Sequence, residues 1–375
     1  MSNQKETSYN ASDVLAWAGS QPAPVSWSDP EYLFSGLLIP AFGAFGVVGN
    51  ILNLTILSWR YNKREINVLE RGALLGLIAL AVSDLCFCLG ILPGAVFYDS
   101  KAKFSAKTFH YYYQLYGVYL HDVFIKISTW LTVVIATARY VAICHPLKAR
   151  IFAGLFATKV AIVVTYAAWF LLLSPILWSY HVYHYEAASQ NVSFFLLDIG
   201  QFAANAPFRL SFTYLWALLG YFFPVVVLAF CNIKLIRALR ESVKWRECSA
   251  RNAPSGREGN TRITSTLVCL IAMFIVLVSP SELLHFYLDV AQPETYASTK
   301  LAILSVNLLQ TVNFSFHFVL YCAVNVTFRR TIVNAYYCLL AKVRRSPKQR
   351  GLQYSRSISL TRGPTNTFKS VETQV

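Results

Sequence analysis

The sequence predicts an all-α membrane protein, a bundle of seven transmembrane helices followed by a short amphipathic eighth helix. Only 14% of the 375 residues are charged and 55% are hydrophobic, whereas about 25% of the residues of a soluble domain are charged. The mean hydropathy of +0.45 would expose extended apolar patches if the chain folded in water. Seven stretches of roughly 20 mostly apolar residues have the length that a membrane-spanning helix needs.

The seven spans follow these stretches in chain order. They lie at residues 33–59, 71–97, 110–143, 157–180, 211–236, 264–290 and 300–322. The third stretch carries Asp122, Lys126 and Arg139, and we assign it as a span because of its length and position. The spans divide the chain into an N-terminal tail at 1–32, a membrane domain at 33–325, an amphipathic membrane-surface helix at 326–340 and a C-terminal tail at 341–375.

The distribution of basic residues predicts the orientation of the chain. The connections after spans one, three and five and the C-terminal tail contain 26 of the 33 Lys and Arg residues, and such residues concentrate in cytoplasmic loops. We therefore expect the N-terminus outside the plasma membrane and the C-terminus inside. The net charge of +15 then reflects a basic inner face that suits anionic membrane lipid, and not a nucleic-acid-binding domain. Glycosylation triplets at Asn10 and Asn191 lie on the same outer side.

The cysteines predict no disulfide on the outer face. All eight lie in spans or on the inner side, at Cys86, Cys88, Cys144, Cys231, Cys248, Cys269, Cys322 and Cys338. The last of these closes an amphipathic stretch from Thr327 to Leu340, so Cys338 is a candidate for palmitoylation. A plain buried thiol is the equal alternative.

Polar residues in the middle of the spans mark candidate functional positions, because burying them in a bilayer is costly. Asp84 and Asn50 lie at this depth, where polar groups need partners on other helices. We expect Ser128, Asn313 and His317 to complete a polar cluster around Asp84. The cluster is either a helix-packing network or a sodium or proton site.

A second set of ionisable residues lies toward the outer ends of spans three and six. Asp122 and Lys126 are four residues apart on one helix face and could neutralise each other. Asp122 also lies about 25 Å from Arg139 along the helix axis, near the outer mouth. Glu282 follows Pro280 by two positions, and a proline commonly kinks a helix. Asp122 and Glu282 are therefore candidate partners for a positively charged ligand.

The common catalytic motifs are absent from the sequence. It contains no H-E-x-x-H, C-x-x-C or G-x-S-x-G pattern and no glycine motif for phosphates or dinucleotides. We expect neither an enzyme nor a bound cofactor or metal.

Seven short motifs stand in order along the spans. They are GNILN in span one, LAVSDL in span two, ARYVAICHPL at the end of span three, Trp169 in span four, Pro224 in span five, Pro280 in span six and HFVLY before FRR at the end of span seven. Between residues 33 and 340 the chain thereby resembles rhodopsin-like G protein-coupled receptors.

The resemblance implies roles for particular residues. Arg139 and Tyr140 are expected to couple to a heterotrimeric G protein, with Pro146 and Leu147 as further contacts and arrestin as a second candidate partner. Activation is expected to shift the population of states so that span six opens at its inner end. The implied activation switch consists of Asn50, Asp84, Ser128, Pro224, Phe274, Pro280, Asn313, His317 and Tyr321.

The sequence departs from the family at positions that matter for signalling. Ala138 replaces the acid that usually precedes the span-three arginine, so we expect higher basal activity. Val278 stands where an aromatic residue usually precedes the span-six proline. His317 and Phe318 replace a polar residue and the proline of the usual span-seven motif. The imidazole is expected either to form an ion pair with Asp84 in place of a sodium site or to form a neutral hydrogen bond.

The usual outer disulfide of the family is also missing. Gln114 lies near the expected position of its first cysteine, and the loop from Tyr180 to Arg209 contains no cysteine. Packing of the many tyrosines around this loop is a candidate substitute, and an ordinary interfacial tyrosine belt is the alternative.

The residues near the outer mouth indicate the ligand class. Residues 309–313 contain no lysine for retinal, and His121 stands where amine receptors carry an aspartate. The stretches SPSELLHFYLDV and NFSFHFVLYCAVNVTFRR resemble invertebrate peptide receptors of the FMRFamide-receptor kind, which implies a peptide with a basic, aromatic end. Its predicted contacts are Asp122, Glu282, His121, His285 and Asp289. Open alternatives are a receptor for a small non-peptide ligand, a receptor that does not signal, and a multi-span transporter.

Overall fold

The computed structural model describes residues 30–63, 66–96, 112–187, 192–200, 204–248, 257–291, 296–324, 328–334 and 337. The chain separates into two compact units, Met1–Val326 and Thr327–Val375, and each is described by itself. The predicted modification sites at Asn10, Asn191 and Cys338 lie outside the described residues.

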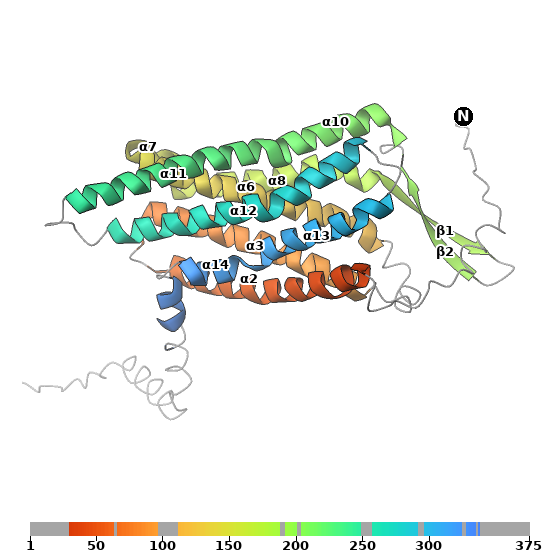
Figure 1. The fold of residues 1–375 in the computed structure, drawn as a ribbon, viewed down its shortest axis with the longest axis horizontal. Coiled ribbons are helices and arrows are strands. Elements are labelled where there is room, and N and C mark those ends of the chain that lie inside the picture. Colours follow the sequence, from red (N-terminus) through yellow and green to blue (C-terminus); the bar gives the residue numbers. More distant parts are fainter. Residues whose placement is uncertain are drawn as a thin grey trace, which may run out of the picture. The chain divides into compact units, whose positions relative to one another are not determined.

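Long helices that run side by side form the first unit (Figure 1). They are α2 (Ile39–Tyr61), α3 (Val68–Val96), α6 (Val118–Cys144), α8 (Leu155–Leu172), α10 (Ala206–Ala217), α11 (Phe223–Cys248), α12 (Arg257–Ala291), α13 (Tyr296–Ser315) and α14 (His317–Val324). The π-helical turns η1 (Tyr32–Leu38) and η2 (Tyr113–Gly117) precede α2 and α6, and the π-helical turn η4 (Leu218–Phe222) joins α10 to α11. The 3-10 turn η3 (Ser174–Trp178) follows α8. The short helix α7 (Pro146–Phe152) joins α6 to α8. Helix α2 packs on α3, α3 on α6, α6 on α11, α11 on α12, α12 on α13 and α13 on α2, so the bundle closes into a ring.

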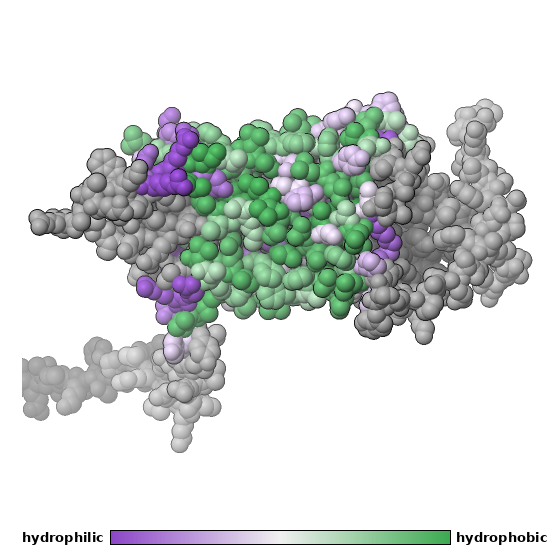
Figure 2. Space-filling model, viewed as in Figure 1, coloured by the Kyte–Doolittle hydropathy of each residue, from purple (hydrophilic) through white to green (hydrophobic). Residues whose placement is uncertain are grey.

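The lengths and compositions of these helices confirm the predicted seven spans. Among the described residues, six helical segments are long and apolar enough to cross a membrane, at Tyr32–Tyr61, Val68–Gly94, Val118–Cys144, Leu155–Trp178, Ala206–Ala238 and Ile271–Ala291. The pair α13 and α14 makes the seventh when it is counted as one span. Figure 2 shows hydrophobic side chains over the middle of the helices and hydrophilic ones toward their ends, the pattern of a protein surrounded by lipid.

Span seven differs from the continuous helix that the sequence predicted. It breaks after Ser315, and α13 and α14 meet at an angle of 52°. Helical hydrogen bonding continues up to the amide of Phe316, which donates to the carbonyl of Val312 at 3.0 Å, and resumes at Leu320. No proline lies between Tyr296 and Val324, so the usual covalent cause of a kink is missing.

A β-hairpin in the connection between α8 and α10 was not predicted. Strands β1 (Tyr180–Ala187) and β2 (Val192–Ile199) are antiparallel, with Tyr180 opposite Ile199 and Ala187 opposite Val192. Both strands are rich in aromatic and β-branched residues, which favour extended backbone. The tyrosine side chains of this hairpin lie outside the description, so the expected tyrosine packing around the loop stays a prediction.

The second unit contains the predicted amphipathic segment. Residues 328–334 are helical, which agrees with an eighth helix over part of the expected range. Its position at the membrane surface stays a prediction.

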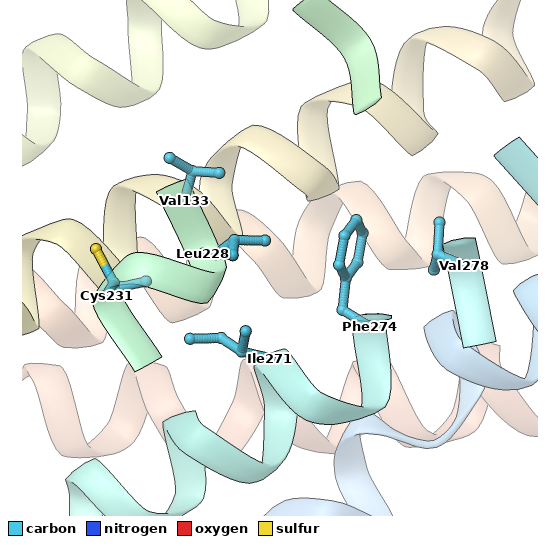
Figure 3. Packing of buried hydrophobic residues seen from close by; sticks show 7 residues of the cluster. Val133, Leu228, Cys231, Ile271, Phe274 and Val278 are labelled. Carbon is cyan, nitrogen blue, oxygen red and sulfur yellow. The ribbon is translucent and has the colours of Figure 1, made fainter. Parts of the chain in front are cut away.

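A hydrophobic cluster joins α6, α11 and α12 in the half of the bundle that contains Arg139. It consists of Val133, Ala136, Leu228, Cys231, Ile271, Phe274 and Val278, and Figure 3 shows side chains of the three helices meeting. Val278 is completely buried although it stands where an aromatic residue was expected. Phe274, one turn earlier on α12, supplies the aromatic ring of this core.

Helix α2 approaches its neighbours closely because it presents glycines to them. A Cβ atom placed on Gly46 would lie 2.5 Å from the sulfur of Cys88 and 2.7 Å from Oγ of Ser315. Real Cβ atoms do not approach other heavy atoms so closely, and forcing extra carbons into a packed core costs about 1–3 kcal/mol. Gly46 thus sets the spacing between α2, α3 and α13.

We expect Gly46→Val to lower the midpoint of thermal unfolding of the detergent-purified protein, because Cys88 and Ser315 must move to admit the side chain. Ala44→Val is the matched control, since Ala44 is exposed on the same helix. Equal midpoints for the two variants would contradict the tight packing at Gly46.

Candidate ligand-binding site

A cavity of about 660 Å³ opens between α3, α6, α10, α12 and α13. This volume lies within the range of pockets that bind small molecules. All five residues predicted to contact a ligand line it, namely His121, Asp122, Glu282, His285 and Asp289. The last three share one face of α12 because residues three, four and seven positions apart align on a helix.

An ion pair between two transmembrane helices closes the floor of this cavity. Nζ of Lys126 on α6 lies 2.5 Å from Oε2 of Glu282 on α12. The exposed fractions of the two side chains are 1% and 4%, so neither charge is solvated by water. Such a pair in a low dielectric holds only because each charge neutralises the other.

Span five completes the environment of Lys126. The ammonium lies 3.9 Å from the ring centroid of Trp216 on α10, a cation–π contact. Gly220, in the π-helical turn η4, leaves room for the lysine stem, since a Cβ there would lie 3.0 Å from Cε of Lys126. The same turn directs the carbonyl of Leu219 to Nε1 of Trp130, at 3.0 Å.

Lys126 forms no direct ion pair with Asp122, although it acts on Asp122 electrostatically. Lys126 reaches Glu282 instead, because Trp216 and Gly220 direct its stem toward α12. Asp122 is left half-buried at the cavity wall, without a hydrogen bond or ion pair to any described residue.

Charges of both signs surround Asp122. Lys126 and Glu282 act on it with opposite signs, as do His285 and Asp289. Asp289 in turn has Arg209 and His285 as its charged neighbours. Asp122 thus has charged neighbours of both signs but no direct ion pair with a described residue.

The remaining walls are aromatic and neutral polar. Nε2 of His285 lies 3.1 Å from Oδ1 of Asn307, and Oγ of Ser281 donates to Oε1 of Gln310 at 3.2 Å. The sequence reasoning had missed the lining residues Asn307, Gln310, Thr311, Tyr113, Phe208, Arg209, Phe212 and Trp216. The helical register of span seven could have suggested its three residues, Asn307, Gln310 and Thr311. The residues of span five could not be assigned in this way, because a π-helical turn interrupts that span.

The polar cluster expected around Asp84 lies deeper in the bundle. Oδ2 of Asp84 is 2.6 Å from Nδ1 of His317, and Oδ1 accepts from Oγ of Ser128 at 2.7 Å. Asn50 donates from Nδ2 to the carbonyl of Phe314 at 3.1 Å. Ser128 and His317 therefore meet Asp84, as predicted, and Asn50 joins span one to span seven.

No contact with Asp84 is seen for Asn313, which was also predicted to join the cluster, and its Oδ1 is buried without a hydrogen-bond partner among the described residues. Asn313 and Tyr321 are buried, and Pro280 lies inside α12 one residue before Ser281. Among the described residues, no group of three or more His, Cys, Asp or Glu side chains could hold a metal ion.

The end of α6 that carries the predicted coupling residues lacks a restraining acid. Within the described residues Arg139 makes no ion pair, and its Nε is buried without a hydrogen-bond partner. The nearby ion pair of Arg60 and Glu70 acts on it only electrostatically. The side chains at the start of α12, residues 260–262, lie outside the description.

The predicted contact residues of the second inner loop lie on α7. Pro146 is the first residue of this helix, where proline fits because no backbone donor is needed. Leu147 is 95% exposed. Oη of Tyr140 lies 3.1 Å from Nε2 of His145 and so ties the end of α6 to the start of α7.

Comparison with known proteins agrees with this geometry. The model of the 7 transmembrane receptor (rhodopsin family) matches residues 49–325. The FMRFamide receptor of Drosophila melanogaster is 25% identical over 318 residues, and the match covers 82% of this chain but only 54% of that receptor. The putative G-protein coupled receptor F59B2.13 of Caenorhabditis elegans is 25% identical over 338 residues, with coverages of 82% and 74%. Squid rhodopsin shares the fold with a TM-score of 0.62 at 16% identity, over 86% of this chain and 91% of that chain.

We expect Lys126→Met and Glu282→Met each to lower the free energy of unfolding by about 3–5 kcal/mol, because each leaves an unpaired buried charge. The double replacement should recover most of this loss. The measurement is the thermal unfolding midpoint of the purified protein.

The exposed pair of Lys300 and Glu31 supplies the control. Replacing either partner by Met should cost less than about 1 kcal/mol. If the double replacement of Lys126 and Glu282 lowers the free energy of unfolding by the sum of the two single losses, the pairing is contradicted.

Proposed function

Because the chain belongs to the rhodopsin family of seven-transmembrane receptors, we propose that it binds an extracellular peptide with a basic and an aromatic residue at its end and activates a heterotrimeric G protein. It is a receptor and not an enzyme. In this proposal the protein lies in the plasma membrane with its N-terminus outside. The distribution of basic residues along the chain supports that orientation.

The single observation that carries the ligand class is the free carboxylate of Asp122. It faces the cavity, and no described residue pairs with it. A ligand guanidinium would form a charge-assisted hydrogen bond with it, and such bonds are about twice as strong as neutral ones. The ligand therefore carries at least one cation at this depth.

The aromatic lining supports an aromatic residue next to that cation. Phe87 lies on α3, and Phe208, Phe212 and Trp216 lie on α10. Aromatic rings bury a large area and pack in offset or edge-to-face geometry. The name of the Drosophila relative, FMRFamide receptor, agrees with a peptide of this composition.

Signal transfer follows from differential binding. A ligand that prefers the active arrangement of the helices increases its population. Helix α12 has its natural pivot at Pro280, two residues before Glu282, because the proline removes a backbone hydrogen bond. Rotation about this pivot opens the end of the bundle near Arg139, where the exposed Leu147 on α7 provides an apolar contact for a G protein.

We expect Asp122→Asn to weaken the response to a peptide ending in Arg-Phe-amide roughly 10- to 100-fold, because a charge-assisted hydrogen bond contributes about 1.5–3 kcal/mol. The readout is the concentration of peptide that gives a half-maximal second-messenger response in cells with matched surface expression.

A citrulline-Phe-amide peptide, which keeps the shape of arginine without its charge, provides the control. On the unmodified receptor the citrulline peptide should be less potent than the arginine peptide. On Asp122→Asn the two peptides should be equally potent. If citrulline and arginine peptides differ equally on both receptors, Asp122 does not bind the guanidinium. Asp289→Asn is the matched variant, because Asp289 already has Arg209 as a charged neighbour.

We expect the unliganded receptor to signal above mock-transfected cells, because Arg139 has no acidic restraint among the described residues. Ala138→Asp should lower this basal signal by supplying a neighbouring acid, whereas Ala138→Asn should leave it unchanged. A basal signal equal to mock at matched surface expression would contradict this expectation and favour a receptor that does not signal.

A further inference from the structure

The bend in span seven has no covalent cause within the helices that form it. Helices α13 and α14 meet at 52°, yet the segment from Tyr296 to Val324 contains neither proline nor glycine. Sharp kinks also arise at Gly/Ser pairs, at π-bulges and where a side chain or a water inserts into the backbone hydrogen bonds. The side chains that flank the break are therefore the candidates for holding it.

Two side chains from other helices bind span seven on either side of this break. On the α14 side, His317 is the first residue of the helix, and its Nδ1 lies 2.6 Å from Oδ2 of Asp84. On the α13 side, Asn50 donates to the carbonyl of Phe314 at 3.1 Å. That carbonyl would bond the amide of Phe318 in an unbroken helix, so the bond to Asn50 satisfies it within the bend.

Asp84 is the fixed point of this arrangement. Its exposed fraction is 0%, and Ser128 on α6 donates to its other oxygen at 2.7 Å. A carboxylate only accepts hydrogen bonds, so the imidazole donates from Nδ1. The contact anchors the first turn of α14 to α3 and α6 in a region that excludes water.

We propose that the hydrogen-bonded pair of Asp84 and His317 holds the bend of span seven, in the place of a proline. His317 is then a positioning residue that sets the direction of α14 and of the buried Tyr321. Unlike a proline, the pair can separate, so the bend is reversible and can straighten when α14 moves.

If Asp84 and His317 act through one shared hydrogen bond, their replacements should not have independent effects. Thermal unfolding of the purified full-length protein measures these effects. His317→Leu keeps the volume but removes the donor, and it should lower the unfolding midpoint by at least about 5 °C. His317→Asn should retain most of the stability, because the asparagine amide can donate from nearly the position of Nδ1. In the Asp84→Leu background, which removes the acceptor, His317→Leu should cause little further loss. Additive losses in this double variant would overturn the proposal.

A proline introduced next to the break tests the bend itself. Phe318→Pro in the His317→Leu background should restore the midpoint, because a proline at 318 pushes away the carbonyl of Phe314, which already bonds to Asn50. Phe318→Ala in the same background is the matched control and should not restore it. Failure of proline to exceed alanine would show that the pair stabilises the bundle without holding the bend.

Discussion

The ion pair of Lys126 and Glu282 is the interaction on which the binding site depends. Both charges are almost fully buried, and their nitrogen and oxygen atoms lie 2.5 Å apart. Isolated charges at this depth would be strongly unfavourable, so neither residue is available to a ligand without a replacement partner. The pair therefore removes Glu282 from the acids that can receive a cation and leaves Asp122, one helical turn from Lys126, without an ion-pair partner among the described residues. It also ties α6 to α12 at the floor of the cavity, next to the pivot at Pro280.

A second buried pair, Asp84 on α3 with His317 on α14, lies next to the side of α6 that faces away from Glu282. Lys126 and Ser128 are two residues apart on α6 and so point to different sides. One side joins α6 to α12 through Glu282, and the other joins it to α3 and α14 through Asp84. Helix α6 is thus the common support for the cavity floor and for the bend of span seven. In the half of the bundle that contains Arg139, α6 contacts α11 and α12 mainly through a hydrophobic cluster (Figure 3).

The sequence predicted what hydropathy and helical spacing determine. The seven spans follow from apolar length, the shared face of Glu282, His285 and Asp289 follows from their spacing, and the partners of Asp84 follow from the cost of polar groups in mid-span. The partner of Lys126 did not follow, because a long lysine side chain reaches acids on its own helix and on the neighbouring one. Trp216 and Gly220 decide between them, and their position depends on a π-helical turn that has no clear sequence signal. The bend at Phe316 was missed because no proline marks it.

The most direct measurement is a structure of the receptor with a bound peptide ending in Arg-Phe-amide. The account predicts that the guanidinium lies within hydrogen-bonding distance of Asp122 while Lys126 remains paired with Glu282. A guanidinium on Glu282, with Lys126 turned to Asp122, would contradict it.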